Sequence, residues 1–116
     1  MTWQEVLEIH GSRRGIRIDE THASLLLDFG LSVYNNRREA GVLYYEGEGK
    51  TGDQTPTRGN ACLLECLELQ RPVLVLERLK PGLWRRAGEH LVVGFEYLQL
   101  EQQQRYVFVF ELLELE

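Results

Sequence analysis

Apolar residues occur along this chain in short runs, separated by polar stretches that are rich in glycine, proline or charge. Five runs have the length and the β-forming content of strands, at residues 24–29, 41–45, 73–79, 91–100 and 106–113. Residues 31–34 extend the first run past Gly30, where we expect a bulge. Polar composition predicts loops or turns at residues 11–15, 35–40, 47–59, 81–82 and 101–104.

One segment has the spacing of a helix. Residues 60–70 place apolar side chains at 63, 64 and 67, with Asn60 as the expected N-cap and Pro72 beyond the end. Cys62 and Cys66 share one face of this helix, where we expect them to be small buried apolar residues. Residues 2–9 either open as a short helix capped by Thr2 or run extended.

These elements predict an α+β fold. Five or six short strands and one or two helices favour a small, curved, mostly antiparallel β-barrel, with helix 60–70 packed at one end. The expected core places three leucines of the helix against the strands: Leu63, Leu64 and Leu67 against Leu25, Val73, Val75, Val107 and Val109. The 116 residues fit a single domain over 1–116, either complete or cut from a longer protein.

Composition adds mainly exclusions. Apolar residues make up 43% of the chain and no run approaches the ~20 that a membrane span needs, so we expect no membrane partner. The first residues do not form a secretory signal, and two cysteines cannot build a disulfide framework, which favours a cytoplasmic location. The net charge of −5 argues against binding nucleic acid by bulk electrostatics.

The arginines modify that conclusion. Eleven of the thirteen basic residues are arginine, and several are clustered: Arg13, Arg14 and Arg17; Arg37 and Arg38; Arg85 and Arg86. Arginine suits two-pronged contacts with phosphate, although such clusters are equally explained by solvation.

The sequence contains little that indicates catalysis. The three histidines have no metal-ligand spacing, and no nucleophile, phosphate-loop or deaminase motif is present, so we expect no catalytic residues, metal or cofactor. The loop at 47–54 is more informative, because its glycines permit close backbone approach to a ligand and its N–H groups can form an anion-binding nest. Tyr44 and Tyr45 precede it on opposite strand faces, so one can enter the core while the other lines a cavity.

Several motifs together resemble a known family. In chain order they are Ile9-His10-Gly11, the loop Arg13-Arg14-Gly15-Ile16, the strand 24–27, Tyr45-Glu46-Gly47-Glu48-Gly49, Gly52-Asp53-Gln54, Gly59-Asn60-Ala61 and Arg71-Pro72-Val73-Leu74-Val75. From residue 9 to about 80 this order resembles the SRA (YDG) domain, in its bacterial modification-dependent restriction type. The resemblance implies a PUA-like, SRA-like curved barrel that reads a modified base.

The chain departs from the family pattern at four places. The Tyr-Asp-Gly motif is missing, and residues 83–89 stand there; Glu46 replaces a threonine; the finger used to fill the gap in the duplex is absent. The family's second pocket aromatic and its aspartate are best matched by Tyr34 with Asn36 or Arg37, and Phe29 is an alternative ring. Loss of that aspartate affects cytosine specificity, because a carboxylate accepts from the exocyclic amine of the base.

The resemblance implies a reader of 5-methylcytosine or 5-hydroxymethylcytosine in double-stranded DNA, which flips the base and serves restriction or defence. Any nuclease would lie on another domain or subunit. The implied base pocket comprises Tyr45, Tyr34, Phe29, Asp28, Asn36, Glu46 and Gly47, and the implied DNA-backbone contacts are Arg13, Arg14, Lys50, Arg58 and Gln54. Gly49, Gly52, Asp53 and Asn60 would shape the turn. One alternative is an SRA-like interaction or regulatory domain that no longer reads DNA; another is a nucleotide-binding enzyme that uses Asp53 and Glu48.

Overall fold

The computed structural model of the protein describes residues 1–29 and 34–115. The elements in these residues are, in order, α1 (Trp3–His10), β1 (Ile16–Ile18), β2 (Ala23–Asp28), β3 (Arg37–Glu39), β4 (Val42–Glu46), α2 (Arg58–Leu69), β5 (Val73–Lys80), β6 (Leu83–Leu100) and β7 (Arg105–Glu114). The predicted α+β class is confirmed. Neither helix of this part of the chain is long and apolar enough to cross a membrane.

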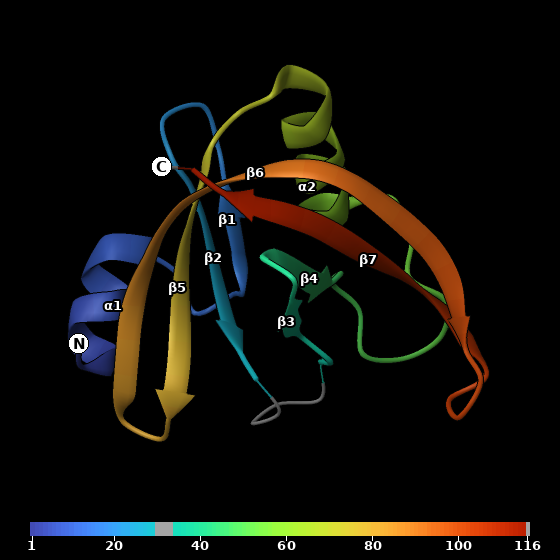
Figure 1. Ribbon diagram of the computed structural model, residues 1–116, viewed down its shortest axis with the longest axis horizontal. Coiled ribbons are helices and arrows are strands. Elements are labelled where there is room, and N and C mark those ends of the chain that lie inside the picture. The colour runs from blue at the N-terminus through green and yellow to red at the C-terminus, as the bar shows by residue number, and fades with distance from the viewer. Residues whose placement is uncertain (30–33, 116) are drawn as a thin grey trace.

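The strands form one strongly curved sheet in the order β1-β2-β5-β6-β7-β4-β3 (Figure 1). β2 and β5 pair in parallel, and the other pairings are antiparallel, as the sequence predicts. The 18-residue β6 pairs first with β5 and then with β7, and register shifts at Val75/Leu76 and Val92/Gly94 mark where the ladders are irregular. Such bulges increase local twist, which helps the sheet to curve.

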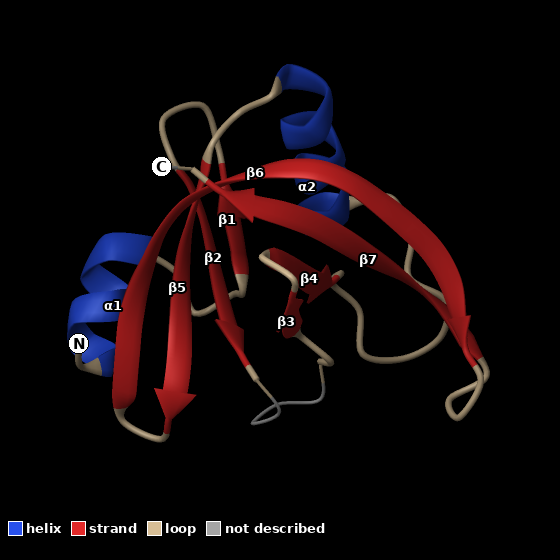
Figure 2. Cartoon of the chain, in the orientation of Figure 1, coloured by secondary structure: helices blue, strands red, loops and turns tan. Residues whose placement is uncertain are grey.

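The two helices pack at different places on the sheet (Figure 2). α1 contacts β2 and β6, whereas α2 contacts β6 and β1. Thr2 caps α1 through a capping box with Glu5: the Glu5 N–H donates to Thr2 Oγ1 at 3.2 Å, and the Thr2 N–H donates to Glu5 Oε1 at 3.1 Å. The helical alternative for residues 2–9 is therefore the observed one.

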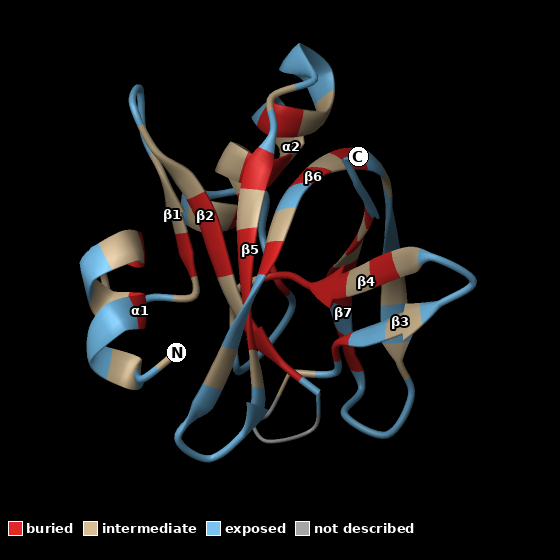
Figure 3. Cartoon of the chain, turned by 60° about the vertical axis from the view of Figure 1, so that its left-hand side comes forward, coloured by how far each residue is buried: buried red, intermediate tan, exposed pale blue. Residues whose placement is uncertain are grey.

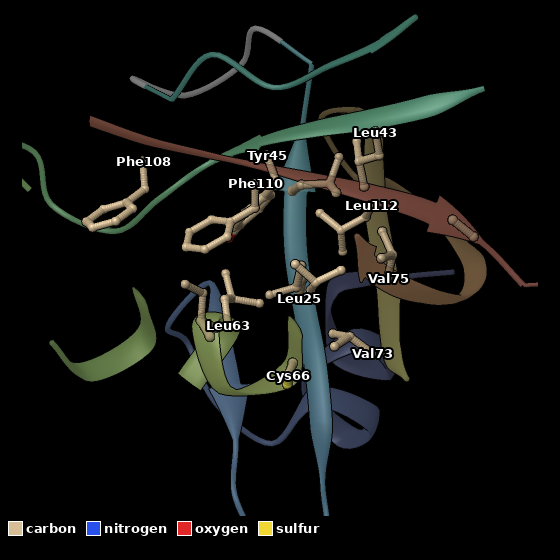
Figure 4. Packing of buried hydrophobic residues seen from close by; sticks show 14 residues of the cluster. Leu25, Leu43, Tyr45, Leu63, Cys66, Val73, Val75, Phe108, Phe110 and Leu112 are labelled. Carbon is tan, nitrogen blue, oxygen red and sulfur yellow. The ribbon is translucent and has the colours of Figure 1, made fainter. Parts of the chain in front are cut away.

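The core lies within the curve of the sheet (Figure 3). Its buried side chains include Leu25, Leu27, Leu43, Tyr45, Leu63, Cys66, Val73, Val75, Phe108, Phe110 and Leu112 (Figure 4). Leu64 and Leu67 pack against this cluster while partly exposed, and Val107 is fully buried outside it. Of the two cysteines, Cys66 is buried and Cys62 is half-buried.

Four local predictions are corrected by the structure. Helix α2 begins at Arg58 after Thr57, so Asn60 is not its N-cap. The predicted turn at 35–40 contains the short edge strand β3, and β1 was not predicted; both have three residues, too few to show an alternating pattern. β6 begins at Leu83 rather than at residue 91. Its first half was not predicted because the paired arginines and Gly88 interrupt the apolar pattern there. The expected bulge at Gly30 and the strand continuation at 31–33 lie outside the described residues.

Candidate nucleic-acid interface

A cavity of about 480 Å³ opens between α1, the 11–15 loop and the ends of β2 and β5. Four residues of the implied base pocket line it: Tyr34, Tyr45, Asp28 and Asn36. The other lining residues are Trp3, Arg13, Gly15, Leu26, Leu27, Arg78, Gly82 and Trp84. Its size is within the range of pockets that enclose small organic ligands.

Tyr45 belongs to both the core and the cavity. Its side chain, on β4, lies among the core side chains (Figure 4). It is 6% exposed, and its hydroxyl donates to the Leu26 carbonyl at 3.4 Å. Burial raises the pKa of this hydroxyl far above its usual range, so it stays neutral. A Cβ at Gly15 would lie 3.2 Å from the same hydroxyl, so glycine leaves room there. Tyr45 therefore presents a small part of its surface to the cavity.

Asn36 and Asp28 supply opposite hydrogen-bonding groups to the cavity. Asn36 Oδ1 accepts from the backbone N–H of Glu46 at 2.9 Å. Because a backbone N–H can only donate, this contact fixes the orientation of the amide, and the Nδ2 group is what Asn36 can offer to a ligand. Asp28, 9% exposed, brings a carboxylate. The cavity wall thus contains a carboxylate acceptor from β2 and the amide donor of Asn36.

Two tryptophans and an arginine in the cavity wall were missed by sequence reasoning. The Trp3 and Trp84 ring centroids are 5.4 Å apart, with an interplanar angle of 31°. Backbone pairing between Met1 and Trp84, with the Trp84 N–H donating to the Met1 carbonyl at 3.0 Å, holds the start of α1 beside β6. Arg78 comes from β5. Trp84 lies in residues 83–89, where the Tyr-Asp-Gly motif of the family is missing. This departure was the one sequence feature that could have drawn attention to Trp84.

The glycine loop at 47–57 is held by buried amide side chains. Asn60 Oδ1 accepts from the Glu48 N–H at 2.7 Å, while Asn60 Nδ2 donates to the carbonyls of Glu48 and Thr55. Gln54 Nε2 donates to the Gly47 carbonyl at 2.7 Å, and Gln54 Oε1 accepts from the Phe108 N–H at 2.9 Å. These bonds explain why Asn60 does not cap α2: its side chain is occupied by the loop.

Further contacts tie the same loop to β7. Asp53 Oδ1 accepts from the Tyr106 N–H at 2.8 Å. Arg105, 6% exposed, donates to the carbonyls of Gly49 and Gly52 at 2.8 and 3.2 Å. Gly49 and Gly52 have φ angles of 127° and 67°, in the left-handed region that favours glycine. The loop is therefore a folded structure with fixed carbonyl positions.

The 11–15 loop is held instead by histidine. His10 Nε2 lies 2.6 Å from the Arg14 carbonyl, which can only accept, so this nitrogen donates. His10 Nδ1 then accepts from the Ser24 hydroxyl at 2.5 Å, and Ser24 Oγ accepts from His22 Nε2 at 2.6 Å. Burial lowers the pKa of His10, which keeps it neutral in this chain of bonds. The family-like Ile-His-Gly thus positions the loop that carries Arg13 and Arg14.

A basic hollow of about 400 Å³ adjoins the cavity. Arg14, Lys50 and Arg58 line it together with Glu48, so two loops distant in sequence supply its cations. Tyr34 lines both this hollow and the cavity, and its hydroxyl accepts from the Gly49 N–H at 3.4 Å. Three of the implied DNA-backbone residues therefore lie beside the implied base pocket, and Arg13 lines the cavity itself.

The structure places four of the implied site residues elsewhere. Phe29 is 40% exposed in a separate hollow beside Glu77, which pairs with Arg38 and Arg85. Glu46 faces away from the cavity, on the side of β4 opposite Tyr45. Gly47 and Gln54 are buried within the loop network, so the Gln54 amide is engaged by backbone groups rather than exposed to a phosphate.

No curated protein matches the chain at a significant level. Among solved structures, the SUVH5 SRA domain in complex with hemi-methylated CG DNA is 25% identical, with a TM-score of 0.83 over 99% of this chain and 84% of that one. SUVH5 SRA bound to fully hydroxymethylated CG DNA is 24% identical, with a TM-score of 0.81 over 99% and 85%.

A comparison with a restriction endonuclease gives the same fold. The modification-dependent TagI restriction endonuclease is 21% identical, with a TM-score of 0.81 over 99% of this chain, which spans 48% of the TagI chain. These likenesses confirm the predicted SRA-like fold. The ScoMcrA-like SRA domain family matches residues 4–116, which is nearly the whole chain. The protein therefore belongs to the ScoMcrA-like SRA domain family.

Proposed function

We propose that this domain binds double-stranded DNA and reads a modified cytosine, of the 5-methyl or 5-hydroxymethyl class, by accepting the flipped base in its cavity. The observation that carries the proposal is the cavity, which is lined by Tyr34, Tyr45, Asp28 and Asn36. The membership of the chain in the SRA family supports the same function. The structures of SUVH5 SRA in complex with hemi-methylated and with fully hydroxymethylated CG DNA support it.

The cavity residues have separate roles in this proposal. Tyr34 supplies the larger stacking surface, because it is half-buried whereas Tyr45 is almost enclosed. Base–aromatic stacking is worth roughly 1–3 kcal/mol and offsets part of the few kcal/mol that flipping costs. Asp28 accepts from the exocyclic amine of cytosine, in the role that the family gives to an aspartate from another position. Asn36 donates to an acceptor on the same base.

The basic hollow would hold the DNA backbone. Arg14, Lys50 and Arg58 face phosphates flanking the flipped nucleotide, and Arg13 reaches the nucleotide at the cavity rim. Such contacts position a duplex without reading its sequence. They also reconcile DNA binding with a net charge of −5, because the cations are concentrated beside the cavity.

A role in restriction or defence extends the proposal. It is supported by the TagI likeness, since TagI is described as a modification-dependent restriction endonuclease and this chain spans about half of it. We assign to this domain the recognition step, performed in the cytoplasm, and place any DNA cleavage on another domain or subunit.

Binding to matched duplexes tests the proposal. Fluorescence anisotropy with unmodified, 5-methylcytosine and 5-hydroxymethylcytosine duplexes at two salt concentrations should show tighter binding to a modified form. Tyr34→Ala should reduce that preference by about 5- to 150-fold, the loss of one stacking contact. Tyr44→Ala is the matched control, because Tyr44 lies on the same strand as Tyr45 but on its opposite face.

The competing interpretation is an interaction domain that has lost DNA reading. It is favoured by the net charge of −5 and by the burial of Tyr45, whose ring is only 6% exposed and offers little surface for stacking. Equal binding of all duplexes would support this interpretation and refute base reading. An unchanged preference in Tyr34→Ala would refute the stacking role given to Tyr34.

A further inference from the structure

The cavity is larger than one flipped base requires. Its volume is about 480 Å³. Even at roughly 30 Å³ for each non-hydrogen atom, which is the share of one molecule in liquid water, the eight such atoms of cytosine occupy only about 240 Å³. The residues assigned to the base account for only part of the lining. We call the remaining part of the cavity the tryptophan end; it is lined by Trp3, Arg78, Gly82 and Trp84.

Strand register sets the order of the groups along the cavity wall. Asp28 on β2 pairs with Arg78 on β5, and Arg78 pairs with Trp84 on β6. All three line the cavity, so a carboxylate, a guanidinium and an indole follow one another across three strands. Neighbouring strands are ~4.8 Å apart, which places Trp84 about 10 Å from Asp28. Tyr45 meets this wall at β2, through its bond to the Leu26 carbonyl. The base is therefore held at β2, and the tryptophan end lies further along, at β5 and β6.

The polar groups of the tryptophan end have no partners among the described residues. Arg78 is half-buried, yet its guanidinium forms no hydrogen bond or ion pair within residues 1–29 and 34–115. Every other buried or half-buried arginine has a protein acceptor: Arg17 donates to the His10 carbonyl, Arg38 to Glu77, Arg71 to the His22 carbonyl and Arg105 to the Gly49 carbonyl.

The two indoles show the same feature. Trp3 and Trp84 are half-buried, and in the described part of the chain neither indole N–H donates to a protein group. A buried tryptophan N–H usually has a hydrogen-bond partner. The ring centroids are 5.4 Å apart with an interplanar angle of 31°, so the rings form one apolar wall. The tryptophan end thus combines flat aromatic surface with three donor groups, a combination that suits a ligand rich in hydroxyl oxygens.

The position of the substituent on a modified cytosine connects this end to the base. C5 is bonded to C4, which carries the amine assigned to Asp28, so a group on C5 begins beside Asp28. A methyl or hydroxymethyl group extends only one or two bonds of about 1.5 Å, and it stops well short of Trp84. A hexose joined to the hydroxymethyl oxygen spans the remaining distance. Its C–H face can pack on the indoles, and its hydroxyl oxygens can accept from Arg78.

We propose that the tryptophan end binds a sugar carried by the 5-hydroxymethyl group of the flipped cytosine, so that the domain reads a glycosylated base. This inference rests on the base-reading function proposed above and names its substrate more closely. Trp3 and Trp84 supply the apolar wall for the sugar ring, and Arg78 donates to its hydroxyl oxygens. A backbone phosphate could use Arg78 in the same way, but it has no use for the aromatic wall.

Binding to four duplexes of one sequence tests this inference on the intact chain. Their target cytosine is unmodified, 5-methyl, 5-hydroxymethyl or β-glucosyl-5-hydroxymethyl. Fluorescence anisotropy should show the glucosylated duplex bound at least about tenfold more tightly than the 5-hydroxymethyl duplex. Trp3 and Trp84 are the only tryptophans of the chain, so their emission reports directly on this end of the cavity. That emission should change more with the glucosylated duplex than with the 5-methyl duplex.

Two variants separate a sugar contact from a phosphate contact. Trp84→Ala should lower the preference for the glucosylated over the 5-hydroxymethyl duplex by about 5- to 10-fold, the loss of one aromatic contact. Arg78→Ala should lower the same preference at least about fivefold. Because the Arg78 guanidinium has no partner among the described residues, this variant keeps the test valid even if Trp84→Ala does not fold. Arg86→Ala, an exposed arginine of the same hairpin, is the matched control and should leave the preference unchanged.

The outcomes distinguish this inference from the function on which it rests. Tighter binding of the 5-methyl and 5-hydroxymethyl duplexes, with equal or weaker binding of the glucosylated one, would overturn the inference and leave the proposed function standing. Equal binding of all four duplexes would overturn both. A glucosyl preference that survives in Arg78→Ala and Trp84→Ala would remove the sugar from this end. An Arg78→Ala variant that binds all four duplexes more weakly by one factor would assign Arg78 to a phosphate instead.

Discussion

The two loops beside the cavity both place basic side chains there, but different chemical groups hold each loop in position. Both carry basic residues, Arg13 and Arg14 on the 11–15 loop and Lys50 on the 47–57 loop. The first loop is held by neutral histidine and a serine hydroxyl, whereas the second is held by Asn60, Gln54 and Arg105. Amide and guanidinium groups do not titrate near neutral pH, but histidine does. We therefore expect the 11–15 loop to respond to mild acid and the 47–57 loop not to respond.

The hydrogen bonds that hold the two loops also connect them to different numbers of elements. The 47–57 loop is bonded to α2 through Asn60 and to β7 through Arg105, Phe108 and Tyr106. The 11–15 loop is bonded to α1 and β2 through His10 and Ser24. A single change in the amide network should therefore disturb more of the fold than a change of protonation on the histidine side.

The largest expected effect comes from breaking the amide network. Gln54→Ala removes the partners of the Phe108 N–H and the Gly47 carbonyl, both within a buried region. Each orphaned group costs about 1–3 kcal/mol, so urea denaturation should show a loss of roughly 3 kcal/mol. Gln102→Ala, in the exposed β6–β7 turn, should change stability by less than about 0.5 kcal/mol. A loss no larger than that of the control would show that the loop does not need this amide.

A smaller effect should separate the two loops by pH. Burial lowers the pKa values of His10, His22 and His90, so the unfolded chain binds more protons than the folded one below about pH 6.5. The free energy of unfolding should therefore fall as pH decreases from 7 toward 5. Hydrogen exchange should accelerate in the 11–15 loop before it does in the 47–57 loop, because protonated His10 Nδ1 cannot accept from Ser24.

Glu46 provides the control for this pH dependence. Burial raises its pKa, so the folded protein binds the extra proton and Glu46 opposes the histidine effect above about pH 4.5. Glu46→Gln should make the loss of stability toward pH 5 steeper. A flat stability profile in the wild type, or acid-accelerated exchange at both loops together, would contradict the contrast between them.

The smallest expected effect on stability is at the basic residues themselves. Arg14→Ala and Arg58→Ala should each change the free energy of unfolding by less than about 0.5 kcal/mol, because both side chains are exposed. Each should weaken binding of modified and unmodified duplexes alike and reduce the salt slope by about one unit. Arg86→Ala, an exposed arginine of β6, is the matched control. Identical salt slopes for all variants would exclude phosphate contacts from the basic hollow.

Sequence reasoning identified the elements whose pattern is local. Strands at 23–28, 42–46, 73–80 and 105–114 each contain a clear apolar run, and the position of α2 follows from its spacing. For residues 2–9 the sequence left a helix and an extended segment as alternatives. It failed where a tertiary contact decides the outcome. Asn60 has the chemistry of an N-cap, yet its amide holds the glycine loop and α2 begins two residues earlier. The first half of β6 carries Arg85 and Arg86, whose charge concealed the strand.

The candidate site could also be predicted only in part from the sequence. Tyr34, Asp28, Asn36 and Tyr45 lie near one another in sequence, so motif order could suggest that they form one pocket. Trp3, Arg78 and Trp84 reach the cavity from α1, β5 and β6, and only the packing of those elements reveals them. The burial of Gln54 was equally hidden, because glutamine is usually exposed and no local pattern indicates a buried amide.

The parallel pairing of β2 with β5 has a consequence for how the protein folds. Parallel strands need a long connection, and here residues 29–72, which include β3, β4 and α2, separate the strands that pair Ser24 with Leu74. Closing a loop of that length costs entropy before any contact is gained, so this step slows folding. The cavity draws its walls from both strands and from the connection between them. We therefore expect the cavity to form only after β5 has paired, because a chain ending before residue 73 lacks the lining residues Arg78, Gly82 and Trp84.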